Sequence, residues 1–273
     1  MAELVFCKLG GSVLTDKQRP ATPRPGAIAR LAAEIAAALA QQPGLRLLLG
    51  HGSGSFGHVV AQRYHVQEGI AADADWWGYA ETGAAAAQLN RLVTDACIEA
   101  GVPVVSIQPS ASARCREGEL LRMEDYPIRQ ALDHGLVPLV YGDVALDDRR
   151  GCTIVSTEAE FTYLASQLHP ARIVLVGEVD GVYDADPLTG TVARHIARIT
   201  PATYAQIEGK LSGSHGVDVT GGMLSKVRQM VGLVERGHAG RVHLISGLQP
   251  GALAEVLLDP DASRGTLIVG AER

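Results

Sequence analysis

The chain has 273 residues, of which 47% are hydrophobic and 20% are charged, as in a globular protein that buries a full core. This composition excludes collagen, coiled coil and disordered protein. The formal net charge is −6 and no stretch forms a basic stripe, so we expect no nucleic-acid partner.

The sequence carries no sign of secretion or of a membrane anchor. Its N-terminus lacks a basic region and its first apolar run stops at Lys8, which is unlike a signal peptide. No apolar run approaches the roughly 20 residues of a membrane span. The cysteines are scattered and form no Cys-x-x-Cys pair: Cys7, Cys97, Cys115 and Cys152. This spacing disfavours a disulfide framework and a zinc site, so we expect a cytoplasmic protein with no membrane partner.

Short apolar runs rich in strand formers alternate along the chain with longer helical patterns. The predicted strands are residues 4–9, 45–49, 102–107, 136–141, 172–176, 242–245 and 266–269. The predicted helices are residues 26–42, 76–100, 127–135, 157–168, 222–237 and 250–258. Continuous apolar runs such as Leu47-Leu48-Leu49 are typical of strands buried on both faces. The pattern therefore predicts an α/β fold with helices on both faces of a mainly parallel sheet.

Two segments, 113–123 and 146–154, are predicted to form hairpins, and we expect them to extend the edge of the main sheet. The second contains the turn-like run Asp147-Asp148-Arg149-Arg150-Gly151. No internal repeat or linker is present, which predicts a single domain over residues 1–273.

The first glycine-bearing loop follows the strand at 4–9 and reads KLGGSVLTDK from Lys8 to Lys17. Gly10 and Gly11 allow successive backbone N–H groups to turn inward and hold an anion. Lys8 and Lys17 flank these glycines and can add positive charge. The alternative is an ordinary strand-to-helix turn with two solvated lysines.

The second loop, HGSGSFGH at 51–58, matches the G-x-G-x-x-G pattern through Gly52, Gly54 and Gly57. A dinucleotide site would also need an acid about 20 residues later, at the end of a second strand. The segment 67–75 contains no strand, which disfavours NAD. His58 is instead suited to an anion, whereas His51, at the strand end, is expected to be buried and hydrogen-bonded.

Three further segments stand where ligands bind in open α/β sheets. Asp143, in YGDV at 141–144, either orients a lysine or substrate or is a turn residue. The acidic segment 177–187 either wraps a nucleoside or is a surface loop. The segment DVTGGMLSK at 218–226 opens a helix with Lys226 one turn in, which favours phosphate. No Walker A motif occurs, so a P-loop NTPase is not expected.

Taken in order, these segments resemble the amino acid kinase superfamily, and within it the isopentenyl phosphate kinases. The matching pieces are KLGGSVLTDK at 8–17, HGSGSFGH at 51–58, YGDV at 141–144, VDGVYDADP at 179–187 and DVTGGMLSK at 218–226. Each motif alone is modest evidence for the family, but together, in this order, they cover most of the chain. The end of the last long strand, Ile245-Ser246-Gly247, also fits.

The resemblance implies the amino acid kinase fold, an αβα sandwich around a mainly parallel sheet, in a homodimer. It implies an acceptor-binding lobe at about 1–170 and an ATP-binding lobe at about 171–273. It also implies that ATP, with Mg²⁺, phosphorylates the small molecule isopentenyl phosphate to isopentenyl diphosphate. The alternative within the fold is a kinase of another small phosphate or phosphonate such as fosfomycin. The alternative from another class is a catalytically silent nucleotide-binding regulator.

The resemblance also implies roles for individual residues. Lys17, His58 and Lys8 would be catalytic, and Ser53, His58 and Gly142 would bind the acceptor phosphate. The residues implied to bind ATP are Lys8, Gly10, Gly11, Ser12, Gly54, Asp180, Tyr183, Gly222 and Lys226. No residue is implied to bind a metal directly.

This chain departs from the family pattern at two places. Ser53 replaces the middle glycine of the second loop. Ser156-Thr157-Glu158 stands where the family commonly has Ser-Gly-Asp, which leaves the role of Glu158 open.

Overall fold

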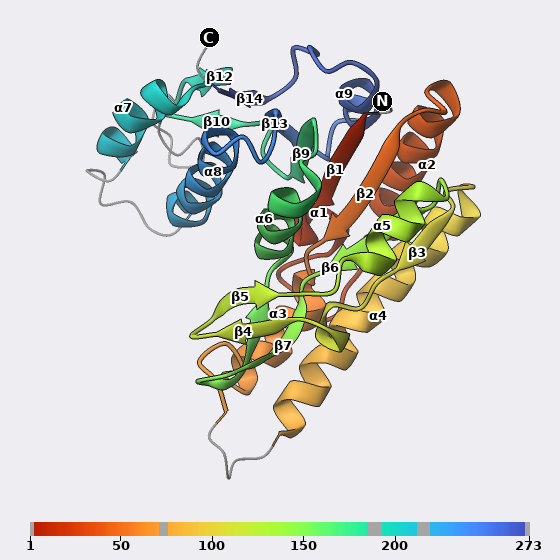
Figure 1. Ribbon diagram of the computed structural model, residues 1–273, viewed down its shortest axis with the longest axis vertical. Coiled ribbons are helices and arrows are strands. Elements are labelled where there is room, and N and C mark those ends of the chain that lie inside the picture. Colours follow the sequence, from red (N-terminus) through yellow and green to blue (C-terminus); the bar gives the residue numbers. More distant parts are fainter. Residues whose placement is uncertain (1–2, 71–75, 185–192, 212–218, 271–273) are drawn as a thin grey trace.

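The described part of the chain is built around one eight-stranded sheet. The computed structural model describes residues 3–70, 76–184, 193–211 and 219–270 (Figure 1). The strand order is β12-β14-β13-β9-β1-β2-β6-β3, and every neighbouring pair is parallel except β13 with β14. In that order the strands are Arg198–Ile199, Thr266–Val269, Arg241–Ser246, Arg172–Gly177, Leu4–Leu9, Arg46–His51, Val137–Tyr141 and Val104–Ser106. The predicted mainly parallel sheet is confirmed.

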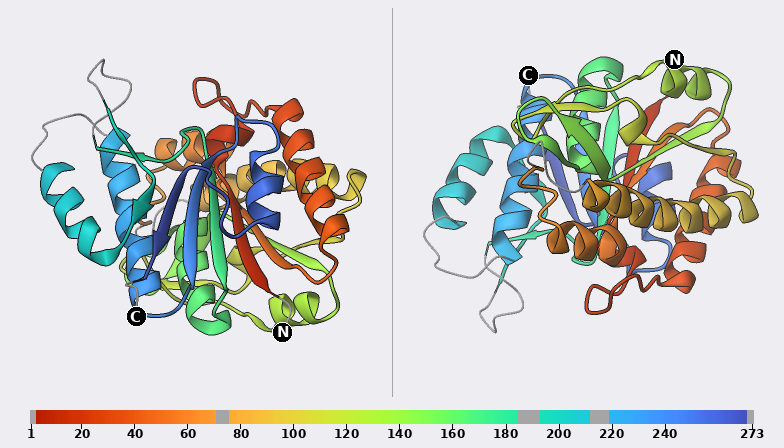
Figure 2. Two further views of the ribbon diagram at one scale, coloured as in Figure 1. Left: turned by 90° about the horizontal axis from the view of Figure 1, so that it is seen from above. Right: turned by 90° about the horizontal axis from the view of Figure 1, so that it is seen from below.

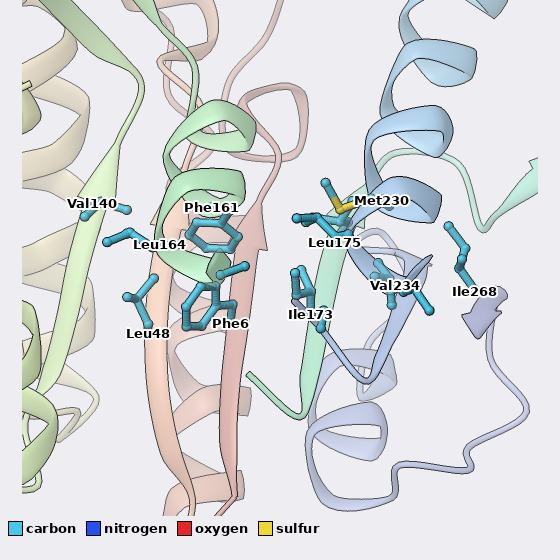
Figure 3. Close-up of a cluster of buried hydrophobic side chains, with 14 of the residues drawn as sticks. Phe6, Leu48, Val140, Phe161, Leu164, Ile173, Leu175, Met230, Val234 and Ile268 are labelled. Atoms are coloured by element: carbon cyan, nitrogen blue, oxygen red, sulfur yellow. The ribbon is translucent and has the colours of Figure 1, made fainter. Parts of the chain in front are cut away.

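Helices cover both faces of this sheet (Figure 2). The helices on one face are α2 (Pro25–Gln41), α4 (Trp77–Glu99) and α9 (Ala252–Leu258), and those on the other are α5 (Tyr126–Asp133), α6 (Thr157–Leu168) and α8 (Val219–Glu235). Successive side chains of a strand point to opposite faces, so Phe6 packs on Phe161 of α6 while Val5 and Cys7 face α2. Figure 3 shows the core on the α6 side. Each strand and helix predicted from the sequence is present, with ends shifted by a few residues.

Several short elements were not predicted. They are α1 (Gly11–Leu14), α3 (Gly54–Arg63), the 3₁₀ turn η1 (Pro109–Ala111), α7 (Pro201–Leu211), β10 (Val182–Tyr183), β11 (His195–Ile196) and β12. α3 begins within the second glycine loop, where two glycines lower the intrinsic helix propensity. Gly57 has to be glycine because a Cβ atom there would lie 2.7 Å from the side chain of Ser53, the residue that caps the helix one turn earlier. Helix α8 also begins earlier than predicted, at Val219.

Both predicted hairpins form, but they make a sheet of their own and do not extend the main one. The strands are β4 (Arg114–Arg116), β5 (Glu119–Arg122), β7 (Asp143–Asp147) and β8 (Gly151–Val155), in the order β5-β4-β7-β8. The expected edge position is wrong because β6 is already paired on both sides, with β2 and with β3. The chain leaving β6 therefore runs on past Gly142 and forms β7 beyond the end of the main sheet (Figure 1).

The short helix α9 is held at both ends by charged side chains from other elements. The Glu34 carboxylate in α2 accepts hydrogen bonds from the N–H groups of Leu253 and Ala254. Buried Arg172 in β9 donates to the carbonyl oxygens of Val256 and Leu257. A negative charge at the start of a helix and a positive charge at its end both interact favourably with the helix dipole.

Other features bear on the sequence-based expectations. All four cysteines are buried free thiols. Among the described residues, no helix combines the length and the apolar character needed to cross a bilayer.

His243, in β13, is a fully buried histidine without hydrogen bonds. Neither ring nitrogen has a hydrogen-bond partner among the described residues. Burial, together with the charges of Arg172 and Arg241, lowers the pKa of His243 to about 4. The ring is therefore neutral in the folded protein at neutral pH.

We predict that His243 makes folding sensitive to mild acid. Below about pH 6.5 the unfolded chain binds a proton at this residue, whereas the folded chain does so only near pH 4. The contribution of the neutral His243 ring to the free energy of unfolding is therefore fully present above pH 6.5 and is lost as the pH falls. Between pH 7.5 and 5.0 the unfolding free energy of the native chain should fall ~2 kcal/mol more than that of His243→Phe. Urea denaturation at both pH values measures these free energies. If the native chain and His243→Phe lost the same unfolding free energy, the prediction would be wrong.

Candidate active site

The first two glycine loops meet at the carboxyl ends of β1 and β2, which are adjacent parallel strands. A Cβ atom on Gly11 would lie 2.5 Å from the backbone nitrogen of Gly54, and one on Gly52 would lie 3.2 Å from that of Gly11. Gly54 has a φ of 53°, a conformation that favours glycine. The glycines are therefore required because two backbones touch here.

This contact gathers free N–H groups on one side of the two loops. The backbone N–H groups of Gly11, Ser12, Ser53 and Gly54 have no hydrogen-bond acceptor in the part of the chain that the structure describes. Such clusters of N–H groups form concave anion sites. The loops singled out from the sequence are thus brought together, and their backbone is suited to phosphate.

Three lysines surround the same place. The Lys8 amine lies 3.0 Å from the Glu158 carboxylate, and the Lys226 amine lies 3.7 Å from the same oxygen. Burial lowers the pKa of Lys226, and the neighbouring charges of Lys8 and Lys17 lower it too, while Glu158 opposes this shift. Lys17 therefore belongs to the cluster, although it comes from the exposed loop that follows α1.

Glu158 is the carboxylate of this cluster. Burial alone would raise its pKa, but Lys8 and Lys226 outweigh burial and the pKa is lowered. An ionised Glu158 neutralises one of the three ammonium groups, so two positive charges remain uncompensated. The cluster is therefore built to receive an anion of multiple charge.

Two cavities adjoin at this place. A cleft of about 700 Å³ is lined by Lys8, Gly10, Gly11, Ser12, Lys17, Gly54, Met223 and Lys226, among others. A second cavity of about 590 Å³ lies between α3, α4 and β7 and is lined by Gly57, Ala61, Thr82, Ala86 and Asp143, among others. Ser53, His58 and Gly142 line both cavities. The residues predicted to bind the acceptor phosphate thus stand where the two cavities join.

His58 faces this junction with a defined ring orientation. Its Nδ1 lies 2.9 Å from the carbonyl oxygen of Gly54 and 3.4 Å from the Ser53 hydroxyl. A carbonyl oxygen only accepts, so Nδ1 carries the hydrogen. Nε2 has no hydrogen-bond partner among the described residues, so it is the ring nitrogen left for a ligand at the junction.

Asp143 anchors backbone and forms no ion pair with a lysine among the described residues. Its carboxylate accepts hydrogen bonds from the N–H groups of Ser110 and Val144. Burial raises the pKa of Asp143, although these hydrogen bonds oppose the shift. Of the two alternatives open from the sequence, the contacts favour the structural role, with the residue also forming a wall of the second cavity.

The predicted nucleotide residues after β9 lie beside the cleft. Val179 and Gly181 line it, whereas Asp180 and Tyr183 bond to each other, with the Tyr183 hydroxyl donating to the carboxylate over 2.7 Å. Gly222 lies near the start of α8, one turn before Lys226. Residues 185–187 of the predicted acidic loop lie outside the described residues.

Glu158 is the functional residue that sequence reasoning left undecided. Acids are common at the start of helices, where Glu158 follows the capping residue Ser156. That position alone does not separate a capping role from an active-site role. The signal that distinguishes them is spatial, because Lys8 and Lys226 reach Glu158 from distant parts of the sequence.

Comparison with known proteins agrees with this arrangement. Residues 3–246 match the model of the amino acid kinase family. The chain is 36% identical to an isopentenyl phosphate kinase of Methanothermobacter thermautotrophicus, over 98% of this chain and 99% of the relative. A solved isopentenyl phosphate kinase superposes with a TM-score of 0.82 at 33% identity, covering 97% of this chain and all of the other. The isopentenyl phosphate kinase of Thermoplasma acidophilum, solved as a product complex, superposes with a TM-score of 0.78 at 27% identity. The superposition covers 97% of this chain and 99% of the other.

We predict that Glu158→Gln lowers kcat about tenfold at pH 7, the effect of losing one hydrogen bond to a charged group. Without the carboxylate, Lys8 and Lys226 repel each other and the pKa of Lys226 falls further. The alkaline limb of the pH–kcat profile should therefore move to lower pH. Glu255→Gln, at a surface ion pair with Arg264, is the matched control and should leave the profile unchanged. An unshifted profile in Glu158→Gln would exclude this role.

Proposed function

The chain belongs to the amino acid kinase family, and on that basis we propose that it transfers the γ-phosphoryl group of ATP to isopentenyl phosphate, giving isopentenyl diphosphate and ADP. The observation that carries the proposal is the junction of the two cavities. One cavity holds the lysine cluster, and the other is a neighbouring pocket lined by small residues of α3 and α4 together with larger polar side chains such as Gln67 and Glu68. Ser53, His58 and Gly142 line both cavities.

ATP would occupy the cleft with its phosphates on the lysines. Gly10, Gly11, Ser12 and Gly54 would provide backbone contacts, and Lys8 and Lys226 would hold the β- and γ-phosphates. Asp180, Tyr183 and Gly222 would lie toward the nucleoside. In this proposal the acceptor binds to residues before about 170, and the C-terminal part from about 171 supplies Lys226 and the residues toward the nucleoside.

The acceptor would place its phosphate at Ser53, His58 and Gly142 and its tail in the second cavity. Gly57, Ala61 and Ala86 are the small residues that leave room there. An acceptor phosphate is already ionised at neutral pH, so its oxygen attacks without a general base. His58 would donate a hydrogen bond to oxygens that do not attack, and Lys17 would follow the charge on the phosphoryl group in transit.

Mg²⁺ would enter with the nucleotide. Within residues 3–70, 76–184, 193–211 and 219–270, no group of three or more His, Cys, Asp or Glu side chains is arranged to hold a metal ion. Kinase Mg²⁺ is held largely by substrate phosphates and water, with one or two carboxylates. Glu158, on the wall of the cleft, is the nearby carboxylate, so the residues fit an ion carried mainly by ATP. Bound there, Mg²⁺ would offset charge on the phosphates.

We also propose a cytoplasmic homodimer. The family resemblance supports the dimer, as do exposed Leu92 and Ile98 on α4 and exposed Val105 on the edge strand β3. We expect sedimentation equilibrium to give a mass of twice the 28.7 kDa of one chain. The four free thiols support a reducing compartment.

The proposed reaction is tested by ADP release with MgATP across a panel of acceptors. The panel comprises isopentenyl phosphate, dimethylallyl phosphate, fosfomycin, glutamate and UMP. We expect isopentenyl phosphate to be turned over with a kcat/KM of about 10⁴ M⁻¹s⁻¹ or more. Preference for fosfomycin would support the alternative kinase, and ATP binding without turnover of any acceptor would support a regulator.

Replacing Lys17 by alanine should lower kcat by about 10²–10³, as does removal of a donor to a transition state. The KM for both substrates should change much less, because Lys17 acts on charge that develops in transfer. Arg19→Ala, in the same exposed loop and paired with Asp16, is the control and should keep normal kcat. Near-normal kcat in Lys17→Ala would disprove its assignment.

A further inference from the structure

His51, at the end of β2, is buried and linked to several parts of the site, yet it touches neither cavity. Its side chain is fully buried and its ring stacks on Tyr141, with centroids 5.6 Å apart. Its carbonyl oxygen accepts hydrogen bonds from the Gly142 N–H and the Thr157 hydroxyl. One residue thus connects the second loop, the strand end at Gly142 and the start of α6, which carries Glu158.

The ring makes contacts at both nitrogens. Nδ1 lies 3.1 Å from the carbonyl oxygen of Gly52, and Nε2 lies 3.2 Å from Oδ1 of Asn90 in α4. Nδ2 of Asn90 in turn lies 2.6 Å from the Ser106 hydroxyl in β3. A chain of polar groups therefore runs from the edge of the sheet through α4 to the second glycine loop.

The tautomer of His51 follows from these partners. Burial lowers the pKa of His51 to about 4, and Lys8 also opposes protonation, so the ring is neutral at neutral pH. A neutral imidazole donates once, and a carbonyl oxygen only accepts, so Nδ1–H donates to Gly52. Nε2 then accepts from Asn90. This tautomer requires the Asn90 amide in the opposite orientation to the one in the structure, with Nδ2 donating to Nε2 of His51 and Oδ1 accepting from the Ser106 hydroxyl. The two ends of an amide are equal in shape, so both orientations fit the same space.

This hydrogen bond fixes the direction of the next peptide group. In a planar trans peptide the C=O and the following N–H point in opposite directions. Because the Gly52 carbonyl points to the buried ring, the Ser53 N–H points away from it. The Ser53 nitrogen is 3.6 Å from the Cβ position of Gly142, and both residues line both cavities. The Ser53 N–H has no acceptor among the described residues.

We propose that His51 is a positioning residue, which turns the Gly52–Ser53 peptide so that the Ser53 N–H binds the acceptor phosphate, with Asn90 holding the ring from behind. The inference rests on the proposed function, since it assigns the phosphate at this junction to the acceptor. It adds a buried histidine outside both cavities to a site whose other histidine, His58, lines both of them.

The test uses His51→Phe, which keeps a ring to stack on Tyr141 and removes the donor. We expect kcat/KM for the acceptor to fall about 10–100-fold, as for the loss of a hydrogen bond to a charged group, while the KM for MgATP stays within about threefold. The matched control is His243→Phe, the same change at another fully buried histidine of the same sheet. Both substitutions should change thermal stability. Only His51→Phe should lower kcat/KM for the acceptor while leaving the KM for MgATP nearly unchanged.

A second variant and a spectroscopic readout keep the inference open to refutation if His51→Phe does not fold. Asn90→Leu leaves the ring and its donor in place, so kcat/KM for the acceptor should fall by less, about three- to tenfold. Nitrogen NMR of the native chain should find hydrogen on Nδ1 of His51 at pH 7. Titration with isopentenyl phosphate should shift the Ser53 amide resonance in the native chain and not in the variants.

Two outcomes separate this inference from the proposed function. If the native enzyme prefers another acceptor, the proposed function fails and the same variants are measured with that acceptor. If His51→Phe matches His243→Phe in both substrate constants, or if His51 carries its hydrogen on Nε2, the positioning role is overturned while the kinase assignment stands. If the native enzyme turns over no acceptor, the protein is titrated with inorganic phosphate. A Ser53 amide resonance that does not shift in that titration overturns the positioning role.

Discussion

The site depends on the contact of two backbones at Gly11 and Gly54. With a Cβ position of one loop only 2.5 Å from a nitrogen of the other, no larger residue fits at Gly11 without moving a strand end. That contact exists because β1 and β2 are parallel neighbours, so their following loops leave the sheet at the same edge. Free N–H groups accumulate there as a result, and a phosphate-binding surface forms before any side chain is considered.

The charged side chains complete that surface by bringing together distant parts of the chain. Lys8 stands within β1, Lys17 in the loop after it, and Lys226 in α8, while Glu158 begins α6. The single carboxylate of Glu158 pairs with Lys8 and Lys226 and leaves an excess of positive charge among the three lysines. Two polyanions can meet only where such an excess of positive charge offsets their repulsion. Burial of Lys8 strengthens this effect because solvent screens it less.

Much of this architecture could be predicted because its signals are local. Continuous apolar runs identified the parallel strands, and glycines after strands identified the loops at β1 and β2. The second sheet was misplaced because hairpin signals say nothing of which strand edges are free, and β3 occupies the edge beside β6. Helix α3 was missed because its two glycines lower the helix propensity, and the close approach of Gly54 to Thr15, which calls for a glycine, joins residues far apart in sequence. The Glu158 cluster and the His51–Asn90 link join residues far apart in sequence, so only the fold reveals them.

The continuous main sheet limits how this molecule can move. β1 and β9 are paired in parallel register from Val5 with Arg172 to Leu9 with Val176, at the boundary between the proposed acceptor and nucleotide parts. A hinge that opened and closed these parts as separate bodies would have to break that ladder. Exclusion of water around bound ligands must therefore come from smaller motions at the periphery. The β4–β5 hairpin is suited to this, because Gly118 and Leu120 already border the cleft that holds the lysine cluster, while the hairpin belongs to the smaller sheet.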